Sequence, residues 1–114
     1  MGLVNLNSLG NKLAFVRHLI ESKGLCMLAV CETWLTSSTP TSFVDLEGLS
    51  FFRKDMQGTV AKHGVGLYVD KKLNPVLDEI DVPNVVAVYI ESWDLHVISC
   101  YRPLHTPLMK ILAW

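Results

Sequence analysis

The residues best suited to chemistry in this sequence are one acid and two asparagines that lie at the ends of apolar runs. Glu32 comes directly after the run Leu25 to Cys31, and Asn5 and Asn7 lie at the end of a shorter run near the start of the chain. Carboxylate and amide oxygens together suit a hard cation such as Mg²⁺. The alternative is a solvated glutamate, with asparagines that cap the next loop or helix.

A second set of polar residues lies at the ends of later β-rich runs. Tyr101 and Arg102 close the last run, and Arg53 closes an earlier one. Such side chains can contact phosphate groups, and the alternatives are a core tyrosine and solvated arginines.

Other common sites are absent from the sequence. The four histidines have no HxxxH or HExxH spacing, which argues against zinc. There is no GxSxG motif, and Gly64-Val65-Gly66 lacks the rest of a dinucleotide or phosphate-loop motif.

The first part of the chain predicts a strand ending near Asn5, a helix from Asn11 to Lys23 and a strand from Leu25 to Cys31. Ser8 or Asn11 is expected to cap the start of the helix, and Gly24 is expected to end it.

The second of these strands lacks polar alternation, which predicts cover on both faces. With a helix between them, the two strands are expected to be parallel, so their carboxyl ends share one edge of the sheet. The sequence therefore predicts that Asn5 and Glu32 are neighbours.

The rest of the chain is predicted to be rich in β-structure. Residues 36–42 and 70–75 are expected loops, and the shape of 108–114 is left open. The expected strands are 49–53 and 65–69, which form a hairpin, and two antiparallel runs within 82–92 and 95–101.

Composition indicates one globular domain. The 114 residues are 50% hydrophobic and carry a formal net charge of −1, so there is neither an acidic tail nor a basic stripe. The three cysteines lie in apolar runs, which indicates buried free thiols in a reducing compartment. Without a signal peptide or a membrane-length apolar run, the expectation is an intracellular protein, nuclear or cytoplasmic, outside the membrane.

Four segments in a fixed order resemble the endonuclease/exonuclease/phosphatase superfamily, and within it the endonuclease domains of non-LTR (LINE-type) retrotransposons. These segments are NLNSLGNKL, LAVCETWL, HGVGLYV and SCYRP. The resemblance runs from about residue 4 to residue 103 and matches the first half of the family domain. It implies an α/β (α+β) fold, part of the four-layer sandwich of deoxyribonuclease I-like proteins, with a mixed sheet and one helix between the first two strands.

The resemblance also implies roles for the polar residues, in a Mg²⁺-dependent hydrolysis of phosphodiesters in DNA. Glu32 matches the family's metal-binding glutamate, and Asn5 the asparagine near the metal and the scissile phosphate. Tyr101 matches the active-site tyrosine. Asn7, Arg53 and Arg102 are implied contacts to phosphate or DNA.

Two later family motifs are missing, Gly-Asp-Phe-Asn and Ser-Asp-His, and the chain contains neither a Gly-Asp nor an Asp-His pair. Residues 1–114 are therefore expected to be a single truncated domain that is inactive alone. A sheet face left uncovered would favour a protein partner. The alternatives are a non-catalytic module that binds protein or nucleic acid, and a fragment of a superfamily phosphatase.

Overall fold

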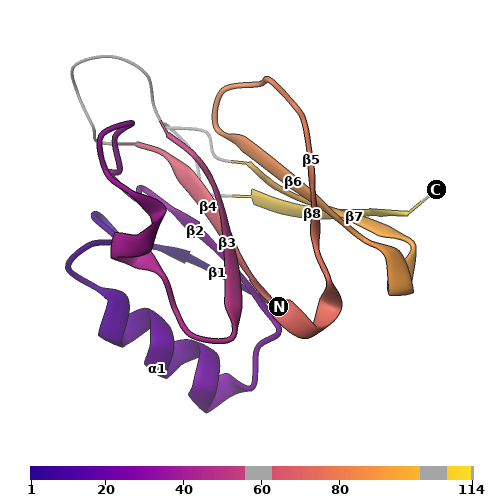
Figure 1. Cartoon of the computed structure of the whole chain (residues 1–114), viewed down its shortest axis with the longest axis horizontal. Helices are drawn as coiled ribbons and strands as arrows, with labels where there is room; N and C mark the ends of the chain where they lie inside the picture. Colours follow the sequence, from indigo (N-terminus) through magenta and orange to yellow (C-terminus); the bar gives the residue numbers. More distant parts are fainter. Residues whose placement is uncertain (56–62, 101–107, 114) are drawn as a thin grey trace.

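A computed structural model describes residues 1–55, 63–100 and 108–113, which form two stacked four-stranded sheets with a helix on one side (Figure 1). The strands are β1 (Gly2–Asn5), β2 (Met27–Cys31), β3 (Leu49–Lys54), β4 (Val65–Asp70), β5 (Val76–Asp78), β6 (Val85–Ile90), β7 (Leu95–Cys100) and β8 (Leu108–Ala113). The α-helix is α1 (Leu13–Lys23), and short 3₁₀ turns span Thr41–Val44, Lys71–Leu73 and Glu91–Trp93.

The first sheet is mixed, with strand order β1-β2-β4-β3. Strands β1 and β2 are parallel and joined through α1, whereas β4 runs antiparallel to both β2 and β3. The predicted strand, helix, strand unit and the predicted hairpin are both confirmed. Asn5 is the register partner of Cys31, so the ends of β1 and β2 lie side by side.

The helix ends as predicted but begins differently. Gly24 adopts the left-handed conformation at φ 61° and ψ 39°, and its N–H donates to the carbonyls of Glu21 and Ile20. The predicted cap by Ser8 or Asn11 is wrong, because Lys12 occupies the N-cap position and no side chain caps the helix. The backbone N–H of Ser8 instead donates to the carbonyl of Glu32, which ties the segment before the helix to the end of β2.

Two apolar layers hold the structure together, one on each face of the first sheet. All five residues of β2 are buried, which confirms the predicted cover on both faces. The layer between α1 and the first sheet contains Val16, Ile20, Leu28, Val30 and Tyr68 among its members. The layer between the sheets contains Met27, Ala29, Cys31, Val65, Leu67, Val69, Val86, Val88, Ile90 and Val97.

The second sheet is antiparallel throughout, with strand order β5-β6-β7-β8. The pairing of β6 with β7 confirms the predicted antiparallel runs, and β8 gives a shape to the end of the chain that the sequence left open. In the described part of the chain the α-helix packs on the first sheet, so none covers the outer face of the second (Figure 1). No helix among the described residues is long and apolar enough to cross a membrane.

Candidate functional site

The carboxyl ends of β1 and β2 bring Asn5 and Glu32 together. Backbone pairing continues past both strands, with the N–H of Leu6 3.1 Å from the carbonyl of Cys31 and that of Ser8 2.9 Å from the carbonyl of Glu32. The N–H of Leu9 likewise lies 2.9 Å from the carbonyl of Thr33. The two chain segments are therefore held in register at the point where the sequence predicted a polar site.

The backbone at this edge is strained. Positive φ angles occur at Asn7 (50°), Ser8 (95°), Glu32 (55°) and Trp34 (58°). In this left-handed region the Cβ of a residue other than glycine lies too close to the backbone carbonyl, and each such conformation costs on the order of 1 kcal/mol or more. Strain of this kind persists where the surrounding structure fixes it, and it gathers at functional sites. Two short segments far apart in sequence share it here.

Glu32 has a close neighbour that the histidine spacing did not reveal. Its Oε1 lies 3.7 Å from Nδ1 of His63, and the side chains of the two residues are 17% and 29% exposed. The N–H of Trp34 donates to the carbonyl of His63 at 3.1 Å, and that of Thr33 donates to the carbonyl of Gly64 at 3.4 Å. The segment before β4 thus lies against the segment after β2, and it adds an imidazole to the site.

Gly64 allows this close approach. Its φ of 109° is one that side chains rarely adopt, and a Cβ added there would lie 2.6 Å from Oγ1 of the buried Thr33. The missing side chain of Gly64 therefore lets the segment before β4 pack closely against Thr33, the residue next to Glu32.

Asn7 borders a hollow of about 590 Å³ beside the end of β1, which Asn5, Asn11 and Lys12 also line. The Nζ of Lys12 donates to the carbonyl oxygens of Leu6 and Asn7, the latter at 3.2 Å. Lys12 therefore supplies a positive charge to the hollow that Asn5 and Asn7 line.

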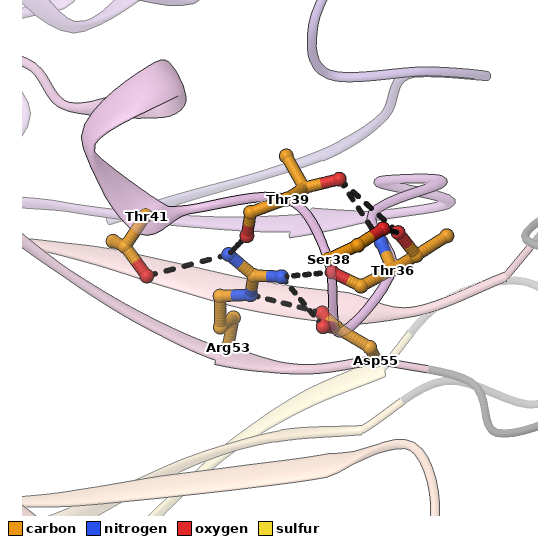
Figure 2. A network of polar contacts seen from close by, with 6 residues as sticks. All are labelled: Thr36, Ser38, Thr39, Thr41, Arg53 and Asp55. Carbon is orange, nitrogen blue, oxygen red and sulfur yellow. Dashed lines mark hydrogen bonds and ion pairs between the residues drawn. The ribbon is translucent and has the colours of Figure 1, made fainter.

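Arg53 is held by the loop that follows the site (Figure 2). Its Nη2 and Nη1 donate to the carbonyls of Thr36 and Thr39, each at 2.7 Å. Nε and Nη2 also form a two-point ion pair with Asp55, at 3.1 and 2.6 Å. Arg53 therefore fixes the loop 36–41, and its predicted contact with phosphate stays a prediction. Tyr101 and Arg102 lie outside the described residues, so their predicted roles also stay predictions.

The thiol of Cys31, beneath the site, is protonated at neutral pH. Burial, with a smaller effect from the charge of Glu32, raises the pKa of Cys31 to about 12. The neutral thiol is a weak nucleophile and a weak hydrogen-bond donor. Its Sγ lies 3.5 Å from the carbonyl oxygen of Val4.

The residues present fit a weakly held cation. Among the described residues there is no group of three or more His, Cys, Asp and Glu side chains placed to hold a metal. A carboxylate residue and an amide residue on two adjacent strand ends still suit Mg²⁺, which keeps several waters and binds through one or two carboxylates and substrate phosphates.

Comparison with known proteins shows the fold. No family model matches the chain, and no curated protein matches it in sequence. A 3′ phosphatase from Neisseria, solved with a product DNA hairpin, is similar in structure with a TM-score of 0.62 over 88% of this chain, at 19% identity. An AP endonuclease from Leishmania major gives a TM-score of 0.62 over 99% of this chain, at 13% identity.

These matches confirm the predicted fold class. The chain has a mixed α/β fold of the deoxyribonuclease I-like type, similar to the folds of these two solved proteins. It spans 39% and 38% of the lengths of the two solved proteins.

Proposed function

We propose that this chain is the amino-terminal part of a Mg²⁺-dependent, phosphodiester-hydrolysing endonuclease-like domain derived from a retrotransposon. The juxtaposition of Asn5 and Glu32 at the carboxyl ends of two parallel strands is the observation that carries the proposal. The fold, which is similar to that of a 3′ phosphatase bound to a product DNA hairpin and that of an AP endonuclease, agrees with it. The ETWL and YRP sequences are the reason to place its origin in a retroelement.

In this proposal Glu32 and Asn5 hold the cation, and Lys12 adds positive charge on the side of β1. A bound Mg²⁺ would polarise the phosphoryl oxygen and stabilise the charge of the leaving oxygen. The register of β1 and β2 keeps both residues at this edge of the sheet before any ligand arrives, so little reorganisation is needed on binding.

The chain is proposed to be inactive by itself. The family motifs that supply a group to activate water and a group to stabilise charge are missing from the sequence. Each such loss costs on the order of 10² to 10⁴ in rate, and groups that act together are not additive. Activity would then require further polypeptide that supplies these groups.

The test combines metal binding with cleavage. Calorimetric titration with Mg²⁺ or Mn²⁺ should show weak binding that Glu32→Gln reduces at least roughly tenfold, because a ligand charge is lost. Glu47→Gln is the matched control, since Glu47 is exposed and precedes β3 at the opposite end of the first sheet. Supercoiled plasmid should stay intact in all three samples.

Two results would contradict the proposal. Equal metal affinity in the wild-type and Glu32→Gln proteins would remove Glu32 from the site. Strong plasmid nicking that Glu32→Gln abolishes would keep the site but overturn the inactivity.

A second candidate function is a non-catalytic interaction module. It is favoured by the edge strand β5, where Val76 and Leu77 are 59% and 48% exposed, and by the lack of a described helix over the second sheet. A role in binding nucleic acid would give an affinity that falls with added salt, whereas a protein-binding role would depend on Val76 and Leu77.

A further inference from the structure

Trp34 is an exposed aromatic residue in the strained segment of the proposed site. The residue is 39% exposed, and its φ of 58° is an outlier for a bulky residue. Over a third of the residue stays accessible to solvent, and its left-handed conformation costs energy. Because neither the accessible part of the indole nor this conformation stabilises the fold, the residue is a candidate for a function in binding.

Burial alternates along the segment that carries Trp34. Thr33 and Leu35 are 0% and 4% exposed, whereas Glu32 and Trp34 reach the surface. The two buried side chains anchor the segment, and the two accessible ones lie two residues apart, at most about 7 Å along the backbone. This separation is comparable to one nucleotide step along a strand.

The backbone that carries the indole is fixed by its neighbours. The N–H of Trp34 donates to the carbonyl of His63 at 3.1 Å, and the carbonyl of Thr33 accepts from the N–H of Leu9 at 2.9 Å. The segment is thus paired to two other parts of the chain. A side chain on such a segment is preorganised, and a ligand that meets it loses less entropy on binding.

We propose that Trp34 stacks on an unpaired nucleobase next to the phosphodiester bound at Glu32, so that the ligand is a single-stranded or locally opened polynucleotide. This inference rests on the proposed function and names the class of its substrate. The bases of an intact duplex are already stacked on each other, whereas an unpaired base offers a free face to an aromatic side chain. With a net charge of −1, the chain lacks a large electrostatic attraction to phosphates, and stacking supplies an attraction of another kind.

Tryptophan fluorescence tests this directly, because Trp93 is a matched control. Trp93 is 41% exposed, close to Trp34, but it lies in the turn between β6 and β7. One variant carries Trp93→Phe and Trp114→Phe and keeps Trp34; the other carries Trp34→Phe and Trp114→Phe and keeps Trp93. Each is titrated without metal with single-stranded oligothymidylate, oligouridylate, a duplex of equal length, an abasic strand and inositol phosphate.

Both single-stranded oligomers are expected to quench the fluorescence of Trp34. The difference between their affinities shows whether the site prefers DNA or RNA. Duplex, abasic strand and inositol phosphate should quench it little, and Trp93 should not respond. In a binding assay Trp34→Leu should weaken affinity for single strands roughly 5- to 100-fold, with a smaller loss for Trp34→Phe. If Trp34→Leu does not fold, the quenching of the single-tryptophan proteins still decides the question.

Equal responses of Trp34 and Trp93, equal quenching by abasic and base-bearing strands, or no quenching at all would overturn the inference. The metal titration of Glu32→Gln gives an independent result. Metal binding without quenching removes only the stacking role, and quenching without metal binding removes only the proposed hydrolytic site.

Discussion

The Oε1 atom of Glu32 lies 3.7 Å from Nδ1 of His63, although the whole of β3 lies between the two residues in the sequence. The contact exists because β2 and β4 are antiparallel neighbours, with Cys31 the register partner of Val65. The residue after one strand and the residues before the other therefore meet at one edge. An imidazole so placed can influence which cation the carboxylate binds.

Replacing His63 with alanine should change metal preference. We expect Mn²⁺ to bind less tightly in His63→Ala while Mg²⁺ binding changes little, because imidazole is a good ligand for transition metals and a poor one for Mg²⁺. Calorimetric titration with each metal gives the ratio of dissociation constants, and His18→Ala serves as the control on the exposed face of α1. An unchanged ratio would show that His63 takes no part in coordination.

Substitution of Gly64 by alanine should destabilise the fold by roughly 1 to 3 kcal/mol, because the backbone conformation is unfavourable and the new Cβ meets Thr33. Chemical denaturation measures the loss. Gly10→Ala is the matched control, since a Cβ at Gly10 has nothing within 4 Å. Similar denaturation midpoints for the two variants would argue against close packing of Gly64 on Thr33.

The loop 36–41 should depend on the guanidinium of Arg53. Arg53→Lys keeps the charge but loses the planar set of donors, so the carbonyls of Thr36 and Thr39 lose their partners at a cost of about 2 kcal/mol. Hydrogen exchange should become faster in residues 36–41 and stay unchanged in α1. Arg17→Lys, on the exposed side of α1, should leave both segments as they are.

Alkaline pH should weaken the fold through Cys31. Its pKa is raised from 9.0 to about 12 in the folded chain, so its stabilising effect is complete below about pH 9 and is lost as the pH rises toward 12. Cys31→Ala should therefore reduce the fall in unfolding free energy between pH 9 and 11, by at most about 1.4 kcal/mol per pH unit. Cys100→Ala is the control.

Part of the alkaline slope should remain in Cys31→Ala. Burial, and to a lesser extent the charge of Asp45, raises the pKa of Tyr68, whose hydroxyl donates to the carbonyl of Val44 at 2.6 Å. Identical slopes for wild-type and Cys31→Ala proteins would contradict the assignment to the thiol.

The parts of the fold that the sequence predicted are those with a local pattern. Helical spacing gave α1, the position of Gly24 gave its end, and the unbroken apolar run gave β2. The parallel crossover then followed from topology, and it was enough to place Asn5 beside Glu32.

The rest depended on contacts that no local pattern encodes. The contact of His63 with Glu32 requires the register of β2 and β4, and the positive φ angles of Glu32 and Trp34 occur without the glycine or asparagine that marks such positions. The helix cap was missed because Ser8 pairs with the end of β2. Strand β5 has only three residues, too few for a clear alternation.

The apolar layer between the two sheets has a consequence for the order of folding. Its first-sheet side is complete in sequence by Val69, but its second-sheet side arrives with Val86 to Val97. In a chain emerging from the ribosome, the apolar side chains on this face of the first sheet therefore stay exposed until β6 and β7 are synthesised. Because this apolar surface stays uncovered during that interval, we expect the nascent chain to bind chaperones until β6 and β7 follow.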